Sequence, residues 1–85
     1  MSDAVVDQVR RVLSEQGRLA VDANQLAPED NLYDAGMTSH ASVNVMLALE
    51  DAFDTEFPDR MLTRGVFESI ASISTAISEL SEEAA

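Results

Sequence analysis

Three stretches of this 85-residue chain repeat apolar residues at the three- and four-residue spacing that is typical of an amphipathic helix. We expect helices over residues 3–16, 39–53 and 69–81. The residues predicted to face the core are those that recur at this spacing: Val5, Val9, Val12 and Leu13, then Val45, Leu49, Ala52 and Phe53, and finally Ile70, Ile73, Ile77 and Leu80.

The connections between these helices contain turn-forming residues. Residues 18–37 form a long first loop, and a loop of this length in a small domain is normally functional or held in place by its own apolar side chains. Those available here are Leu19, Val21, Leu26, Leu32 and Tyr33. Pro58 suits the first position of a helix, where its missing N–H needs no partner. We therefore predict a short helix over residues 59–63 that ends before Gly65.

The whole pattern predicts one all-α domain over residues 1–85, a small four-helix bundle with three main helices, one short helix and a long first loop. Ser69 is a suitable N-cap for the last helix, and Gly17 a suitable stop for the first. Residues 82–85 are expected to form a frayed tail. Polar residues opposite the core face of the first helix are expected to face solvent: Arg10, Arg11 and Glu15.

The charge is strongly acidic, with sixteen Asp and Glu against five basic residues and a formal net charge of −11. This charge argues against nucleic acid and anionic membranes as partners, because both require a basic surface. Residues 34–57 contain five acids and no base. They form either a solvated face that keeps the protein soluble or a surface that attracts partners with basic patches. Arg60 and Arg64, which bracket the predicted short helix, either neutralise this acidic segment or lie at the edge of a partner surface.

Several features are compatible with a location in the cytoplasm, where we expect the protein to be a monomer. The chain has no cysteine, which is compatible with a reducing compartment. It has no apolar run near the roughly 20 residues that a membrane span needs. Its first residues show no basic segment followed by an apolar one, so no secretion signal is expected.

Ser39 is the main candidate for chemistry, because it lies where a turn enters the second helix. One interpretation is an N-cap, a role that Thr38 fills equally well. The other is an exposed hydroxyl beside the positive end of a helix dipole, which favours a phosphate there. Met37 and Met61 are interpreted as filler of the core or its rim.

Catalysis by this chain is not expected. His40 is the single histidine, and neighbouring helical residues point about 100° apart, so it does not face Ser39. A nucleophile elbow of the G-x-S-x-G type is missing. No metal site is expected either, because the acidic run 51–59 lacks the alternating ligands, central glycine and terminal glutamate of an EF-hand.

Residues 34–58 resemble the acyl and peptidyl carrier proteins. The family's pattern is roughly D-x-G-x-D-S-L followed by an apolar helix that ends in E-x-x-F. Here it becomes Asp34-Ala35-Gly36-Met37-Thr38-Ser39-His40, then a helix ending in Glu50-Asp51-Ala52-Phe53, and then Thr55-Glu56-Phe57-Pro58. The match extends over most of the chain. The resemblance implies that Ser39 bears 4′-phosphopantetheine from coenzyme A, whose thiol holds an aminoacyl or acyl group as a thioester.

The resemblance also implies partners. One is a phosphopantetheinyl transferase, and another is an ATP-dependent aminoacyl- or acyl-carrier-protein ligase, for which a relative of the aminoacyl-tRNA synthetases is one option. The implied partner surface is the second helix with the loop before Ser39: Met37, Thr38, His40, Val43, Asn44, Leu47 and Asp51. Similarity to stand-alone aminoacyl carrier proteins favours an amino acid as cargo.

Two residues depart from the family pattern: Thr38 replaces the usual aspartate and His40 the usual leucine. We interpret both as marks of a specialised carrier, although His40 is also compatible with a helix residue of no special role. The alternative function is an acidic helical adaptor that is never modified.

Overall fold

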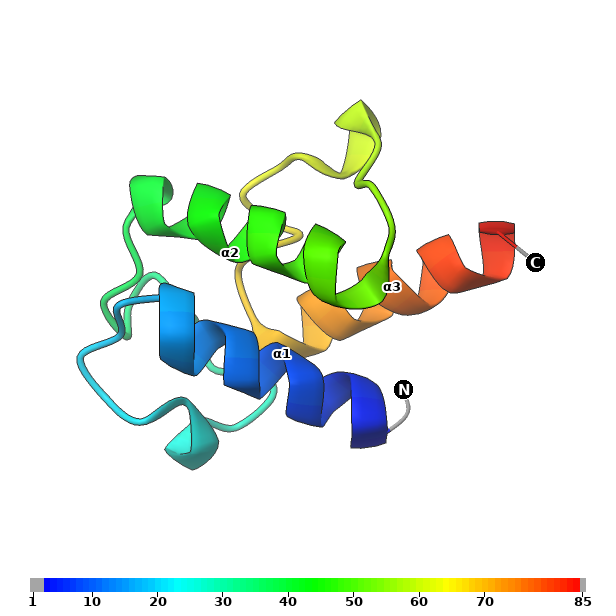
Figure 1. Cartoon of the computed structure of the whole chain (residues 1–85). Coiled ribbons are helices and arrows are strands. Elements are labelled where there is room, and N and C mark those ends of the chain that lie inside the picture. Colours follow the sequence, from blue (N-terminus) through cyan, green and yellow to red (C-terminus); the bar gives the residue numbers. More distant parts are fainter. Residues whose placement is uncertain (1–2, 85) are drawn as a thin grey trace.

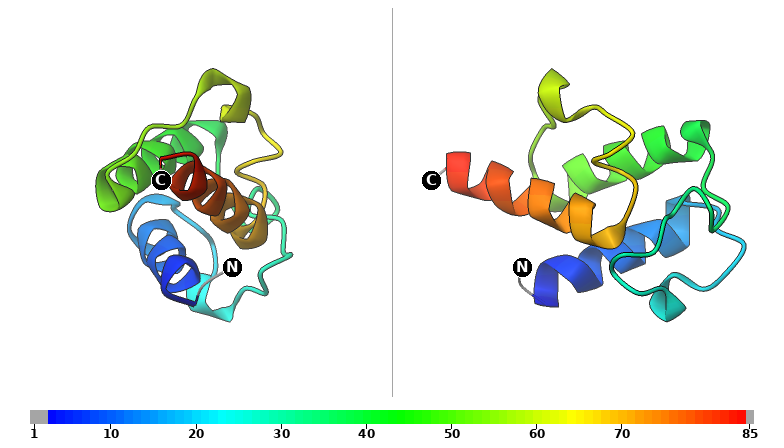
Figure 2. Two further views of the ribbon diagram at one scale, coloured as in Figure 1. Left: turned by 90° about the vertical axis from the view of Figure 1, so that its right-hand side faces the viewer. Right: turned by 180° about the vertical axis from the view of Figure 1, so that it is seen from behind.

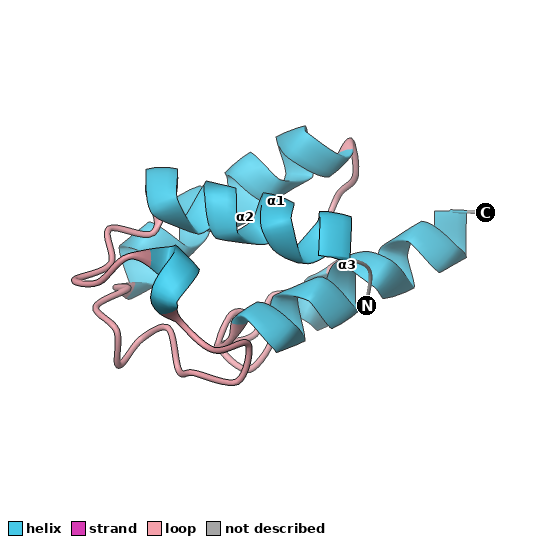
Figure 3. Ribbon diagram, turned by 90° about the horizontal axis from the view of Figure 1, so that it is seen from below, coloured by secondary structure: helices cyan, strands magenta, loops and turns pink. Residues whose placement is uncertain are grey.

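The computed structural model describes residues 3–84. Within them lie three α-helices, α1 (Asp3–Gln16), α2 (Ser39–Phe53) and α3 (Ile70–Ala84), and two short 3₁₀ helices, η1 (Ala23–Gln25) and η2 (Asp59–Met61) (Figure 1). This part of the chain has no strand, and Figure 3 accordingly shows only helices and loops. The predicted all-α class is confirmed, and α1 and α2 have the predicted bounds.

Helix α1 is the central element of the bundle, because it packs against both α2 and α3. α1 and α2 lie side by side and run in opposite directions, while α3 passes behind them (Figures 1 and 2). The first loop, residues 17–38, covers one end of the bundle. The second loop, residues 54–69, returns along α2 to the start of α3. This second loop therefore lies on the side of α2 where the functional site is found.

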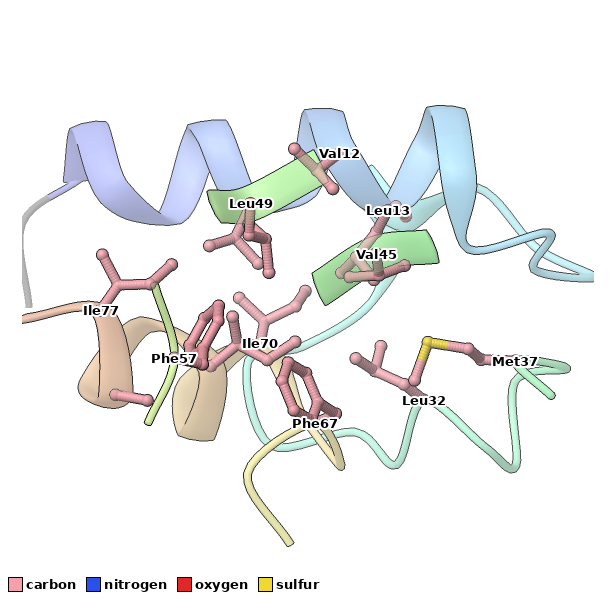
Figure 4. Close-up of a cluster of buried hydrophobic side chains, with 14 of the residues drawn as sticks. Val12, Leu13, Leu32, Met37, Val45, Leu49, Phe57, Phe67, Ile70 and Ile77 are labelled. Carbon is pink, nitrogen blue, oxygen red and sulfur yellow. The ribbon is translucent and has the colours of Figure 1, made fainter. Parts of the chain in front are cut away.

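The core is built from the predicted apolar stripes of the three helices and from residues of both loops (Figure 4). Its largest fully buried apolar residues are Val9, Leu13, Leu32, Val45, Leu49, Ile70, Ile73 and Ile77. Helix α2 contributes Ala41, Val45 and Leu49, one residue per turn, because positions four apart lie on one side of a helix. Burial of these side chains is the main force that holds the bundle together.

The second loop is fastened to α2 by Glu50. The backbone N–H of Phe57 donates to Glu50 Oε2 at 2.8 Å. This bond brings the chain back so that Phe57 is buried and packs edge-on against Phe67, with ring centroids 5.4 Å apart. Asp54, with φ of 50°, adopts the left-handed conformation that ends the helix. The glutamate of the E-x-x-F pattern thus closes the loop.

The first loop is held by α1 as well as by its own apolar residues. Arg10 Nη1 donates to the carbonyl oxygens of Ala23 and Leu26, both at 2.8 Å. Arg10 is half-buried, so its expected solvent-facing position is wrong. Its guanidinium thereby ties two carbonyls of the first loop to α1.

Backbone bonds join the first loop to the second loop and to the start of α3. Leu32 N–H donates to Glu68 O at 2.7 Å, and Ala71 N–H donates to Pro28 O at 2.9 Å. Ser69, the predicted N-cap of α3, accepts from Ser72 N–H at 3.1 Å, and Ser69 N–H donates in return to Ser72 Oγ at 3.1 Å. This reciprocal pair is a serine version of a capping box.

Besides that of Arg10, four expectations about the fold are wrong. Val21 is 48% exposed, because Asp22 caps a 3₁₀ turn that buries Ala23 instead. Ala52 is exposed: it lies in the last turn of α2, where helical spacing alone does not guarantee cover by another element. The short helix ends at Met61 and not at residue 63. Helix α3 extends to Ala84 and not only to residue 81, because glutamate and alanine favour a helix. The frayed tail over residues 82–85 stays a prediction, and Ala85 lies outside the described residues.

Candidate functional site

Ser39 is the first residue of α2, and its neighbour Thr38 is the N-cap. Ala41 N–H donates to Thr38 Oγ1 at 3.0 Å, and Ser42 N–H donates to Thr38 O at 2.9 Å. Ser39 is exposed, and its hydroxyl forms no hydrogen bond within residues 3–84. Of the two interpretations of Ser39, the structure therefore excludes the cap. It leaves a free hydroxyl at the positive end of a helix dipole.

The turn before Ser39 requires glycine. Gly36 has φ of 117°, a backbone conformation that residues with a side chain rarely adopt. A Cβ at this position would also lie only 3.0 Å from Ala20 N. Ala20 N–H donates to Ala35 O at 2.8 Å, which holds the start of the first loop against this turn. The following residue, Met37, is 2% exposed. Its interpretation as core filler is confirmed, and its buried side chain is unable to meet a partner directly.

A pocket of about 400 Å³ opens beside Ser39. Its lining comes from three separate parts of the chain: Tyr33; Ser39, Ser42, Val43 and Met46; and Leu62, Thr63, Arg64 and Phe67. The first loop, α2 and the second loop thus form a groove between them, which we call the Ser39 groove. Sequence reasoning missed it, because its walls are up to some thirty positions apart and no short motif joins them.

Arg64 is the cation of the Ser39 groove. Its guanidinium lies over the ring of Tyr33, 3.8 Å from the centroid. Arg64 forms no ion pair with a described residue. Of its two interpretations, neutralising the acidic segment therefore lacks a direct contact to support it.

The predicted partner residues of α2 form one exposed face. His40, Leu47 and Asp51 are exposed and Asn44 is half-buried, at the spacing that keeps side chains on one side of a helix. Val43, beside them, is 50% exposed and Leu47 53%, so this face of α2 offers two neighbouring apolar side chains to a partner. Thr38, the residue just before α2, is exposed as well. The structure therefore brings together all the predicted partner residues except Met37.

Among the residues that the structure describes, no three His, Cys, Asp or Glu side chains gather to hold a metal ion. None of the described helices is long and apolar enough to cross a bilayer.

Comparison with known families decides the assignment. The family model described as a phosphopantetheine attachment site matches residues 5–77. The chain belongs to the phosphopantetheine carrier proteins. Members of this family bear 4′-phosphopantetheine covalently and are carriers, not enzymes. The site fits that group: one hydroxyl is exposed and unbonded at a helix N-terminus, and a groove begins beside it.

Similar proteins agree with this assignment. An aminoacyl carrier protein from Agrobacterium fabrum (strain C58) is 44% identical over 69 residues, which are 81% of this carrier and 83% of that protein. A chain in the crystal structure of an engineered Bradyrhizobium japonicum glycine:[carrier protein] ligase, complexed with a carrier protein from Agrobacterium tumefaciens and AMP, superposes with a TM-score of 0.83. It is 41% identical, and the match covers 86% of this carrier and 97% of that chain.

A second complex contains a more distant relative. It holds the Bradyrhizobium japonicum glycine:[carrier protein] ligase and a glycylated carrier protein, with a TM-score of 0.76, 28% identity and coverage of 87% of this carrier and 99% of that chain. Coverage this complete by an 85-residue protein means that the matched chains are the small carriers and not the ligase.

Proposed function

We propose that Ser39 is the residue to which 4′-phosphopantetheine is attached, and that the carrier presents an aminoacyl group to partner enzymes. The observation that supports this most directly is the division of roles between two adjacent hydroxyls. Thr38 caps α2, while the hydroxyl of Ser39 is exposed and unbonded. Esterification of Ser39 therefore breaks no hydrogen bond of the fold.

Helix α2 favours the negative charge that attachment introduces. A phosphodiester on Ser39 lies in the first turn of a 15-residue helix, where the dipole and free backbone N–H groups stabilise anions. The first-turn donors of Ala41 and Ser42 are already used by Thr38, which leaves those of Ser39 and His40 to face the anion. The thiol at the far end of the arm supplies the group that holds the aminoacyl cargo as a thioester.

The exposed face of α2 is the proposed docking surface for partner enzymes: a phosphopantetheinyl transferase and an ATP-dependent ligase that loads an amino acid. Val43 and Leu47 offer apolar contacts there, and Asp51 offers charge. Thr38, His40 and Asn44 complete the surface around the attachment point. The ligase complexes of the related carriers support a loading partner of this kind. That this ligase is related to the aminoacyl-tRNA synthetases is part of the proposal.

Intact mass after incubation with coenzyme A and a broad-specificity transferase tests the attachment. We expect a gain equal to one phosphopantetheine, which Ser39→Ala abolishes. Ser42→Ala is the matched control, since Ser42 lines the same groove three residues away and should leave the gain unchanged. If the parent protein gained no mass, the alternative function, an acidic adaptor that is never modified, would be favoured. A gain that survives Ser39→Ala would place the arm elsewhere.

Loading of the holo-carrier then tests the cargo and its partner. With amino acids, ATP and a glycine:[carrier protein] ligase, a second mass gain should identify the amino acid that is loaded. His40→Leu restores the residue usual in the wider family. If His40 helps to select the ligase, this change should lower the loading rate; an unchanged rate would leave His40 without that role.

A further inference from the structure

Arg64 is the one positive side chain in the groove that begins at Ser39. The protein has a net charge of −11 and only five basic residues, so few positive side chains are available to bind an anion. It is held by Tyr33, because the face of an aromatic ring attracts a cation that lies over it. Stacking occupies the flat face of the guanidinium and leaves the N–H groups at its edge free for an anion.

The rest of the groove is apolar. Val43 and Met46 come from α2, and Leu62 and Phe67 come from the second loop. Leu62 is 46% exposed and Val43 is 50% exposed, so their surfaces are open to a ligand. Along the groove the site thus offers, beside one another, an attachment hydroxyl, a cation and an apolar surface.

We propose that Arg64 binds the phosphodiester on Ser39, and that the apolar wall covers the dimethyl-bearing segment next to that phosphate. This rests on the proposed attachment at Ser39. The lining contains a complement for each part of the arm nearest the protein: Ser39 for the ester oxygen, Arg64 for the anion, and apolar side chains for the branched carbon. Guanidinium and phosphate form short, charge-assisted hydrogen bonds. Arg64 is thus a positioning residue that directs the arm along the second loop.

The pocket volume is compatible with this occupant. About 400 Å³ lies within the range for small-molecule sites, so the groove has room for the phosphate and the dimethyl-bearing segment. The ammonium of an aminoacyl group is repelled by Arg64 and gains nothing from an apolar wall. The thiol end with its cargo therefore remains outside, accessible to enzymes.

The test uses the holo-carrier, driven to complete modification by excess transferase and checked by intact mass. Amide and methyl NMR spectra of apo- and holo-protein are then compared, together with the ³¹P shift of the phosphodiester. We expect the arm to move the signals of Val43, Met46, Leu62 and Phe67 as well as those next to Ser39. Arg64→Gln should at least halve the arm-induced changes at these groove residues and should shift the ³¹P signal. Arg64→Lys should restore most of the groove changes and most of the parent ³¹P shift.

Arg11→Gln is the matched control, because Arg11 is an exposed arginine on α1 that does not line the groove. It should leave every arm-induced change as in the parent protein. High salt should weaken the groove changes, since the Debye length falls from about 10 Å at 0.1 M to about 3 Å at 1 M. Spectra of the apo-variants show whether each one is folded.

The two proposals fail in different ways. If no mass gain occurs, attachment at Ser39 is refuted. If the mass gain occurs but the changes are confined to residues next to Ser39, or persist fully in Arg64→Gln, the role of Arg64 is refuted while attachment stands.

Discussion

Replacing Thr38 by alanine removes the oxygen that accepts Ala41 N–H at 3.0 Å, while replacing Ser39 by alanine removes a hydroxyl without a partner. Loss of an N-cap costs about 1 kcal/mol. For a domain of this size, 1 kcal/mol corresponds to a fall in Tm of roughly 4–8 °C. An exposed substitution that breaks no contact stays within about 0.5 kcal/mol. The two adjacent substitutions should therefore have opposite consequences for stability and for attachment.

Circular dichroism at 222 nm, followed against temperature and urea, measures the stabilities, and intact mass measures attachment. Thr38→Ala should unfold at lower temperature yet still accept the arm, whereas Ser39→Ala should unfold like the parent and accept none. Thr38→Asp is the control, because aspartate caps a helix as well as threonine does and its charge favours the N-terminus. If Ser39→Ala destabilised the protein as much as Thr38→Ala, the assigned roles of the two hydroxyls would be wrong.

Three other substitutions test the scaffold around the site by urea denaturation. Gly36→Ala should cost about 1–3 kcal/mol because of its positive φ, whereas Gly65→Ala, where a Cβ meets no atom closer than 3.9 Å, should cost nothing; equal losses would show that strain is not the cause. Glu50→Ala should cost about 2 kcal/mol by leaving Phe57 N–H without its acceptor, and Glu50→Gln should recover about half because an oxygen remains. Ser74→Ala should raise stability by about 1 kcal/mol, since Ser74 Oγ is buried without a partner. A loss of stability there would mean that this hydroxyl is bonded in solution.

The parts of the fold that sequence predicted well are those governed by local rules. The bounds of α1 and α2 follow from apolar spacing and from the residues at their ends, and Ser69 caps α3 as its type suggests. Ser39 and Gly36 were also found in the sequence, because the turn-to-helix junction is a short, contiguous pattern. Which of the hydroxyls at positions 38 and 39 caps α2 was left open, since both residue types form N-caps.

What the sequence could not supply depends on contacts between distant segments. Arg10 resembles any solvent-facing helix residue until its two loop carbonyls are brought near. The 3₁₀ turn that buries Ala23 has only three residues, too few for a periodic signal. The groove needs Tyr33 and Arg64 to meet beside Ser39, and no local pattern connects them.

Two bonds join the first loop to the second loop and to α3, Leu32 N–H to Glu68 O and Ala71 N–H to Pro28 O, and both involve main-chain atoms alone. Such bonds are indifferent to which side chains project from the loops, provided that no proline removes a donor. Outward-pointing positions on both segments can therefore be exchanged without displacing Ser39. A designer who wants to redirect this carrier toward a different ligase can diversify those positions first and leave the buried helix faces untouched.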